Sequence, residues 1–441
     1  MKIINVGVQK NTVLYLIIFF CTCTDLKAQS TPQIIFTDLD NFWVAYDSVK
    51  TESDTLKHED IVKRLYVQKG TAGLKAFIGI RGYSAKQWAL YVRQYPKYFE
   101  SVRGKLQLLK EKLNDYPIAI EYFSKLYPSF RVPEVYFCIG GLNTAGTVVN
   151  NMVLIGTELA IGDTTFNLTE LPVARANWLK SVYKTQNINN ILAVAIHEAV
   201  HTQQKGIAMN LIGQCLKEGS CDFVTELVIK KPLTNPYMLY GKKHEDSLKK
   251  KFVIEMFGRN SKDWLYNGTT AMVGDLGYFM GYAICKKYYE NAADKKQALE
   301  EIIQLNVSDS NAVESFLNKS GYYQEPINKN ELLRQYETKR PQVIEVKPII
   351  SDSLSLSDTI TQLHFIFSVP MNRNNYSINY GPGGKTKYPI TGVKGFSADG
   401  KIFTVKVALL PAHEYEFLID QGFQSQDGYP LKPYLVKFKT N

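Results

Sequence analysis

The chain has 441 residues, a formal net charge of +10 at pH 7, 45% hydrophobic residues and 21% charged residues. This composition excludes a largely disordered chain, and the length is enough for about two to three folded domains. The basic residues are scattered. The densest group, residues 242–251, is interrupted by Glu245 and Asp246, which predicts a solvated helix face. We therefore expect no nucleic-acid partner.

The first 28 residues are typical of a signal peptide. Lys2 and Lys10 precede the apolar run 13–21, and Ala28 is a small residue suited to cleavage. The apolar run is too short to span a bilayer comfortably, so an uncleaved membrane anchor is the less favoured alternative. We expect an extracytoplasmic protein that is periplasmic, at the cell surface or secreted.

Lipid attachment is a second alternative for the N-terminal segment. Cys21 and Cys23 are the candidate sites. Neither is preceded by the small residues that usually stand before a lipidated cysteine, so we rank this alternative below simple cleavage.

The remaining cysteines and isolated histidines carry no motif. Cys138, Cys215, Cys221 and Cys285 are too few for a disulfide scaffold and are expected to be small buried residues. The histidines without a motif are expected at the surface: His58, His364 and His413.

The segment from residue 32 to about 130 is predicted to be mainly helical. Apolar residues recur three and four apart in three stretches, residues 86–93, 98–113 and 118–126. Residues 135–139 and 152–155 are rich in strand-forming residues. The glycine- and asparagine-rich stretch 140–151 between them predicts a loop or hairpin connection.

Helices dominate again up to about residue 304. The predicted helices are residues 188–204, 209–229, 244–256, 271–290 and 295–304.

The sequence pattern changes near Arg340-Pro341. Short alternating runs then follow, the clearest being residues 363–369, 403–407, 415–419 and 434–438, with a turn at Ser397–Gly400. About seven such strands in 100 residues fit a small β-sandwich. We therefore divide the chain into a signal peptide (1–28), a mainly helical α+β domain (32–338) and an all-β domain (341–441).

The central chemical motif is H-E-x-x-H, formed by His197, Glu198 and His201. Two histidines four residues apart lie on one helical face, so both imidazoles can bind one zinc ion. Glu198 lies beside them and can take a proton from a zinc-bound water, whose pKa the metal lowers to about 7. The alternative is a buried amphipathic helix with two solvated histidines. The apolar flanks of both histidines argue against that alternative.

The next helix supplies acids for a third ligand. Glu218 follows His201 by seventeen residues, and Asp222 lies one turn further on the same face. We predict Glu218 as the third ligand and Asp222 as the group that accepts the second ring proton of His197. Two alternatives remain open, namely Asp222 as the ligand, or an ordinary acidic pair on an exposed helix face.

Oxyanion stabilisation requires a further donor. Tyr278 and Tyr282 share one helical face, and we select Tyr282 as a catalytic candidate, although aromatic core packing is the more common role of such tyrosines. His244 is another candidate donor, with a solvated position as its alternative. The loop 140–147 and the strand around Met152 could form an edge for an added peptide strand, and an ordinary hairpin is the alternative.

The combination of H-E-x-x-H with Glu-x-x-x-Asp resembles the gluzincin group of metallopeptidases, with its thermolysin-like, zincin-type architecture. This resemblance implies a glutamate third ligand, here Glu218, and an orienting aspartate, here Asp222. Residues 35 to about 323 also resemble predicted zinc-dependent proteases related to a gliding-motility lipoprotein of Bacteroidetes. The similar stretches are residues 37–43, 136–137, 140–147, 197–201, 218–223 and 277–282. Residues 341–441 resemble bacterial Ig-like domains of the surface-layer type, through residues 367–371 and 397–401.

These patterns together predict an exported zinc metallopeptidase that hydrolyses peptide bonds in a peptide or protein substrate. The alternative is a catalytically quiet, zinc-containing surface or motility-associated protein. Association with the cell envelope is compatible with both, and in the alternative the Ig-like domain is a spacer or adhesion module.

Overall fold

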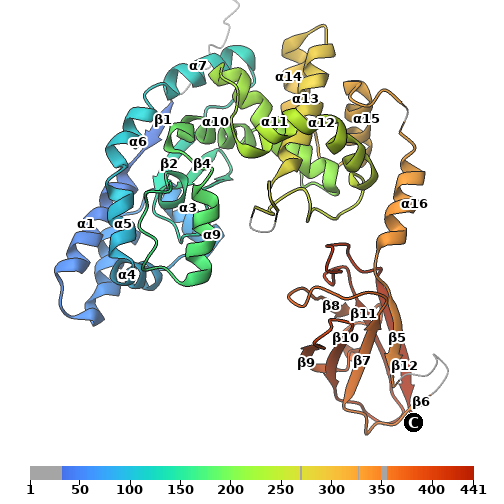
Figure 1. Ribbon diagram of the computed structural model, residues 1–441. Coiled ribbons are helices and arrows are strands. Elements are labelled where there is room, and N and C mark those ends of the chain that lie inside the picture. The colour runs from blue at the N-terminus through green and yellow to red at the C-terminus, as the bar shows by residue number, and fades with distance from the viewer. Residues whose placement is uncertain (1–31, 269–270, 326, 349–354) are drawn as a thin grey trace, which may run out of the picture. The chain divides into compact units, whose positions relative to one another are not determined.

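The computed structural model describes residues 32–268, 271–325, 327–348 and 355–441 (Figure 1). The predicted signal peptide, with Cys21 and Cys23, lies outside these residues. Within the described part of the chain, no helix combines the length and the apolar character needed to cross a membrane.

The N-terminal part is helical, as predicted, and adds one short strand. Its helices are α1 (Thr37–Thr51), α2 (His58–Val62), α3 (Ala72–Arg81), α4 (Ala85–Gln94), α5 (Pro96–Arg103), α6 (Leu106–Lys112) and α7 (Tyr116–Leu126). The single helix expected over residues 98–113 is divided into α5 and α6 at Gly104. Ser84 and Thr71 cap the N-termini of α4 and α3 with their side-chain oxygens, which satisfies backbone donors that have no partner inside the helix.

A small sheet lies among these helices. Its strands are β1 (Gln33–Ile35), β2 (Glu134–Cys138), β3 (Gly146–Val149) and β4 (Met152–Gly156), in the order β1-β2-β4-β3. β1, β2 and β4 are parallel, and β3 is the antiparallel edge strand paired with β4. The two predicted strands are confirmed. The expected connection between them contains β3, so the hairpin joins β3 to β4 through a turn at Asn150, which has a φ of 53°.

The central helices follow the sheet. They are α8 (Thr157–Ala160), α9 (Val173–Tyr183), α10 (Ile191–His201), α11 (Leu211–Ile229), α12 (Pro236–Glu255), α13 (Leu276–Asn291), α14 (Lys295–Gln304), α15 (Ser310–Ser320) and α16 (Lys329–Lys339). All five helices predicted in this region are present; α14 has the predicted ends, and the others are shifted at one end or both. α12 begins eight residues earlier than expected and is kinked at His244, where φ is −121°.

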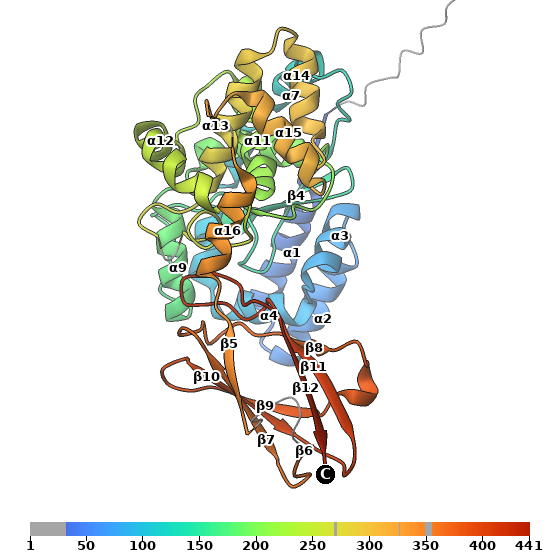
Figure 2. The same ribbon diagram turned by 90° about the vertical axis from the view of Figure 1, so that its right-hand side faces the viewer.

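Three of the central helices form the framework of the site described below. α11 packs against α10 on one side and against α13 on another, and both views show α13 accompanied by α14 and α15 (Figures 1 and 2). β3 and β4 also contact α10. A Cβ on Gly281 would lie well inside van der Waals contact with the Cys215 carbonyl group, so glycine lets the backbones of α11 and α13 approach closely.

The C-terminal part is all-β (Figure 2). Its strands are β5 (Val343–Lys347), β6 (Ser355–Leu356), β7 (Gln362–Phe367), β8 (Ile378–Tyr380), β9 (Ile390–Phe396), β10 (Ile402–Val407), β11 (Glu414–Ile419) and β12 (Tyr434–Thr440). They form two four-stranded sheets, in the orders β5-β7-β10-β9 and β6-β12-β11-β8. Phe365 of the first sheet contacts Phe417 of the second, with ring centroids 6.0 Å apart, so the two sheets share one core. The expectation of a mainly helical part followed by a β-sandwich is confirmed at this level.

Two predictions about isolated residues have different outcomes. Cys138, Cys215, Cys221 and Cys285 are all buried and free, as expected. The surface position expected for His58 is wrong. His58 is only 6% exposed, and its Nε2 atom lies 2.9 Å from the carbonyl oxygen of Glu52.

Candidate metal centre

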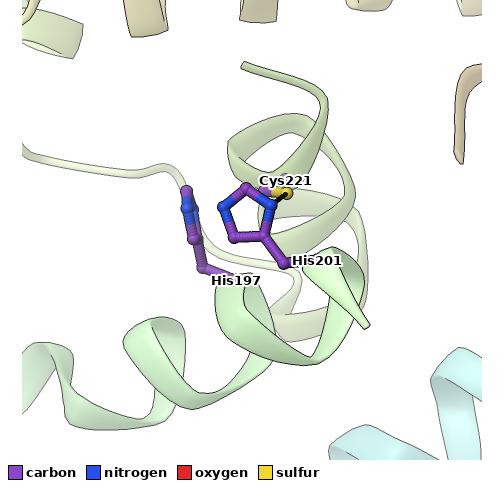
Figure 3. Close-up of side chains that lie close together, drawn as sticks. All are labelled: His197, His201 and Cys221. Carbon is purple, nitrogen blue, oxygen red and sulfur yellow. Dashed lines mark hydrogen bonds between the residues drawn. The ribbon is translucent and has the colours of Figure 1, made fainter. Parts of the chain in front are cut away.

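The two motif histidines lie on the last turns of α10 and face α11. Their ring centroids are 4.9 Å apart and their planes are inclined by 76°. Figure 3 shows both imidazoles projecting from the same side of the helix. Since residues four apart lie one above the other on a helix, this placement follows directly from the spacing.

Glu218 of α11 lies against both histidines. Its Oε2 atom is 3.1 Å from Nε2 of His201 and 3.6 Å from Nε2 of His197. Ligand atoms held about 2.0–2.2 Å from a tetrahedral zinc ion lie about 3.3 Å from one another. The two separations from Glu218 lie on either side of that spacing, so Glu218 lies where it could share a zinc ion with the histidines.

Asp222 holds the other nitrogen of His197. Its Oδ1 atom is 2.9 Å from Nδ1 of His197, and its Oδ2 atom accepts a hydrogen bond of 3.0 Å from the hydroxyl of Tyr237. Nδ1 therefore donates its proton to the carboxylate and leaves Nε2 free to bind a metal. Asp222 lies in the orienting position that the sequence analysis expects, and Tyr237 is an additional partner of this carboxylate.

Gln204 performs the same role for His201. Its Oε1 atom is 2.7 Å from Nδ1 of His201. Its amide Nε2 donates to the carbonyl oxygen of Lys217 at 2.7 Å and contacts the hydroxyl of Ser220 at 2.9 Å, which fixes the orientation of the amide. Nδ1 of His201 must then be protonated, so Nε2 is again the free ligand atom. Gln204 was not among the predicted site residues. The sequence feature that could have identified it is its position three residues after His201.

Cys221 also lies close to the histidines (Figure 3). One ligand atom of each of His197, His201 and Cys221 can be chosen so that all three lie within 4.8 Å of one another. However, Cys221 Sγ lies 3.3 Å from Nδ1 of His201, the nitrogen already held by Gln204. Burial, and then the nearby charges of Glu218 and Asp222, raise the pKa of this thiol well above its ordinary value. Because Nε2 of both histidines faces Glu218, whereas Cys221 lies at Nδ1 of His201, the geometry favours Glu218 over Cys221.

The histidines of α10 and the acids of α11 shift one another's pKa values. Burial opposes the charged form of Glu218, but hydrogen bonds to His197 and His201 outweigh it and hold the pKa of Glu218 below its ordinary value. Burial likewise opposes protonation of His197, and the bonds to Asp222 and Glu218 reverse this effect and raise its pKa. A bound dication would replace the protons that the imidazoles share with these carboxylates.

Glu198 is the carboxylate that the ligands leave free. It lies between α10 and the edge strand β3, where a Cβ on Gly146 would overlap its Oε1 atom. Burial raises the pKa of Glu198 above its ordinary value, against the opposing effect of His201 and His197. The glycine at position 146 thus leaves room for this carboxylate beside the sheet edge.

The tyrosines around the centre differ in placement from the expectation. The hydroxyl of Tyr282 donates to Glu226 at 2.5 Å, and the described residues show no contact between it and the histidines or Glu218. Tyr278 is nearer, because its ring stacks beside that of His197 with centroids 6.2 Å apart. The hydroxyl of Tyr266 lies 3.5 Å from Oε1 of Glu218. The ring of His244 lies against that of Tyr240, with centroids 4.2 Å apart.

A cavity of about 270 Å³ opens beside the metal centre. Its wall includes His197, Glu198, Asp222, Tyr237 and Tyr278. Glu198 and His197 therefore face a space that is large enough to hold part of a bound molecule.

Comparisons with known proteins give one family, and the matching solved structures include two of a single surface-layer protein. Residues 83–251 match the model of the family described as gliding motility protein GldB. No curated protein matches. The surface-layer protein SbsC matches in two structures, one of domains 1–6 and one of residues 31–844, at 15% and 16% identity. Each match covers 61% of this chain and 37% of the SbsC chain with a TM-score of 0.18, too low to bear on the fold.

The family match includes the whole candidate centre. His197, Glu198, His201, Glu218 and Asp222 all lie within residues 83–251. Over this part of its length, the chain is similar to that family.

Proposed function

We propose that this chain is an extracytoplasmic zinc metallopeptidase with a zincin-like domain. One observation carries the proposal. The Nε2 atoms of His197 and His201 converge on Glu218, while Glu198 stays free and faces a cavity. A purely structural zinc site needs no free carboxylate beside its ligands.

The residues of the site would share the work of amide hydrolysis. His197, His201 and Glu218 would hold zinc, which supplies a polarised water and a positive charge for the developing oxyanion. Asp222 and Gln204 fix the tautomers of the two imidazoles. Glu198 would accept the proton of the attacking water on a carboxylate oxygen and pass it to the nitrogen of the leaving amine.

The donor that completes the site is a tyrosine other than Tyr282. The bond from Tyr282 to Glu226 occupies its hydroxyl away from the ligands. Tyr266, whose hydroxyl already reaches the carboxylate of Glu218, is better placed to donate to an oxyanion.

The family match favours a second candidate function. The chain would be a motility-associated zinc protein of the cell envelope, with the same ligands and no turnover, and the β-sandwich would be an Ig-like spacer or adhesion module. Similarity to this family also supports export, and it strengthens the case for lipid attachment at Cys21 or Cys23. The intact mass of the membrane-extracted mature protein would distinguish lipidation from simple cleavage after Ala28.

Replacing Glu198 by Gln tests the two functions. We expect the zinc content to stay near one ion per chain, because Glu198 is not a ligand, and peptide hydrolysis to fall by about 100-fold or more, because the proton acceptor is lost. Metal analysis and digestion of a peptide library by the purified mature protein give the two measurements. Wild-type protein that binds zinc but cleaves nothing, together with normal motility of cells carrying Glu198→Gln, would favour the second function.

A further inference from the structure

We propose that a second cavity, next to the metal centre, binds a large apolar side chain of an extended polypeptide substrate. The cavity has a volume of about 560 Å³, which is within the usual range for ligand sites. This inference rests on the proposed peptidase function and names the substrate feature that the same site selects.

The second cavity lies between three helices, two of which, α10 and α11, also carry the residues of the proposed zinc site. Its walls come from one face of α7, the N-terminal turn of α10 and the C-terminal end of α11, together with the loop 230–235 that leads to α12. It contains none of the proposed zinc ligands.

The two cavities lie next to each other and share part of their walls. Asn190, Ala193, Leu233 and Asn235 line both the 560 Å³ cavity and the 270 Å³ cavity at the metal centre. α10 forms the common wall, because the N-terminal turn lines one cavity and His197 and Glu198 line the other. A helix rises about 1.5 Å per residue, so Asn190 lies about 10 Å along the axis from His197. An extended peptide covers that distance in about three residues.

The lining of the second cavity is suited to an apolar group. Ile118, Leu192, Val228 and Leu233 contribute to its walls. Ile118 is 67% exposed, although it lies on the α7 face that borders the cavity. A large apolar side chain left exposed in a concave site gains stabilisation when a ligand covers it.

One end of the cavity carries a positive charge. Lys230 ends α11 with a φ of 53°, and its Nζ atom lies 3.8 Å from the centre of the Tyr122 ring on α7. This contact joins α11 to α7 at the cavity wall. Lys125 is paired with Glu121 at 2.5 Å, so these two charges of the wall offset each other.

The position of the second cavity beside the first selects the occupant. A small molecule would need only one of the two cavities, whereas a polypeptide that presents its scissile bond to Glu198 must extend away from the centre. The shared residues on and beside α10 place the larger cavity within reach of such a chain. A large apolar residue within about three positions of the scissile bond is therefore the feature that this protein should select.

The test uses full-length mature protein carrying Glu198→Gln, loaded with zinc, so that binding is measured without cleavage. The probes are two fluorescent twelve-residue peptides of Gly, Ser and Asn, one with two central Phe residues and one with Ser in their place. Burying an aromatic side chain predicts at least about tenfold tighter binding of the Phe peptide. Ile118→Glu should abolish this preference, and the matched control Ile80→Glu, on an exposed position of α3, should retain it.

A second arm separates this inference from the proposed function. Peptide-library cleavage by wild-type protein should show a large apolar residue at one position within about three of the cut, and Ile118→Glu should remove that enrichment. Ile118-dependent Phe binding without any cleavage would leave the cavity assignment standing and refute the peptidase. Equal binding of the two peptides, or a Phe preference that survives Ile118→Glu, would overturn the cavity assignment whatever the cleavage result.

Discussion

At the residue scale, Glu218 and Cys221 compete for the role of third ligand. Both come from α11, and both lie within 3.3 Å of a nitrogen of His201. They approach different nitrogens, since Glu218 lies at Nε2 and Cys221 at Nδ1. Because Nε2 of His197 also faces Glu218, only the carboxylate lies where the two free nitrogens converge.

Paired substitutions test this choice. We expect Glu218→Gln to weaken zinc binding by at least about 100-fold, because it removes a charged ligand, while Cys221→Ala changes the affinity by less than about tenfold, as for a partner that only contacts a ligand. Competition with a zinc chelator measures both constants. The reverse order of effects would assign the metal to His197, His201 and Cys221.

A second carboxylate, Glu158, is fully buried away from the metal centre. Its oxygens accept hydrogen bonds from the backbone N–H groups of Gly140 at 2.8 Å and Leu142 at 3.1 Å. It thereby holds the start of the loop that leads to β3 and Gly146. Burial raises the pKa of this carboxyl from 4.5 to about 7, against the lowering effect of those two bonds.

This carboxyl makes stability depend on pH. Between pH 4.5 and 7 the folded chain keeps a proton on Glu158 that the unfolded chain has lost, so the free energy of unfolding falls as the pH rises through this window. Glu158→Gln does not titrate. We expect the stability of wild type relative to Glu158→Gln to be about 3 kcal/mol lower at pH 8 than at pH 4. Urea unfolding at both pH values measures this, with exposed Glu59→Gln as the control, and a pH-independent difference would contradict the expectation.

The residues that spacing predicted and those it missed differ in one physical respect. His197, His201, Glu218 and Asp222 lie on two helices, where the periodicity fixes which side chains share a face. The roles of Gln204, Tyr237 and Gly146 depend on how loops and a sheet edge return to those helices. Tyr282 was selected by helical position alone, and its hydroxyl instead bonds to Glu226 of α11.

At the element scale, the position of Glu218 depends on how closely α11 approaches α13. Gly219 faces the backbone nitrogen of Tyr282, and Gly281 faces the carbonyl group of Cys215, with no space for a Cβ at either glycine. Leu265 and the sulphur of Cys215 similarly crowd Gly277. This helix pair is therefore held by backbone contact next to Glu218, the proposed third ligand.

A single methyl group should separate these helices. We expect Gly281→Ala to lower the free energy of unfolding by about 3 kcal/mol, at the upper end of overpacking effects, because a backbone carbonyl cannot move aside as a side chain can. Zinc affinity should fall as well, since Glu218 moves with α11. Gly79→Ala on α3 is the matched control. A Cβ added at position 79 would meet nothing within 4 Å, so this substitution should stabilise the chain by about 0.5–1 kcal/mol. If the unfolding curve of Gly281→Ala were identical to that of the wild type, the close contact between α11 and α13 would be refuted.

Element types were easier to predict than their limits. The apolar periodicity of residues 295–304 reproduces α14 at both ends, whereas Gly104 divides one predicted helix and His244 kinks a longer one than expected. β1 and β3 are three and four residues long, too short to carry a period-two pattern. They exist because their neighbours β2 and β4 are long, buried strands whose backbones need partners.

At the scale of the whole molecule, the described residues contain two hydrophobic cores. One is formed by buried side chains between Leu39 and Tyr322, and the other by buried side chains between Val343 and Phe438. The composition change at Arg340-Pro341 coincides with the gap between them. The division into domains at this point stays a prediction, because separate cores do not by themselves establish independent folding.

Dividing the chain tests that prediction. Each half contains its own buried core, and the cavity at the metal centre is lined only by residues 190–278, so residues 32–340 should fold cooperatively and bind zinc without the β-sandwich. Because no described residue of the sandwich lines that cavity, the zinc dissociation constant should lie within about twofold of the full-length value. Calorimetry of residues 32–340 and 341–441 as separate proteins should give one cooperative transition for each, and chelator competition gives the affinity. If residues 32–340 aggregate or lose zinc while the full chain binds it, the sandwich is part of the folding unit that builds the site.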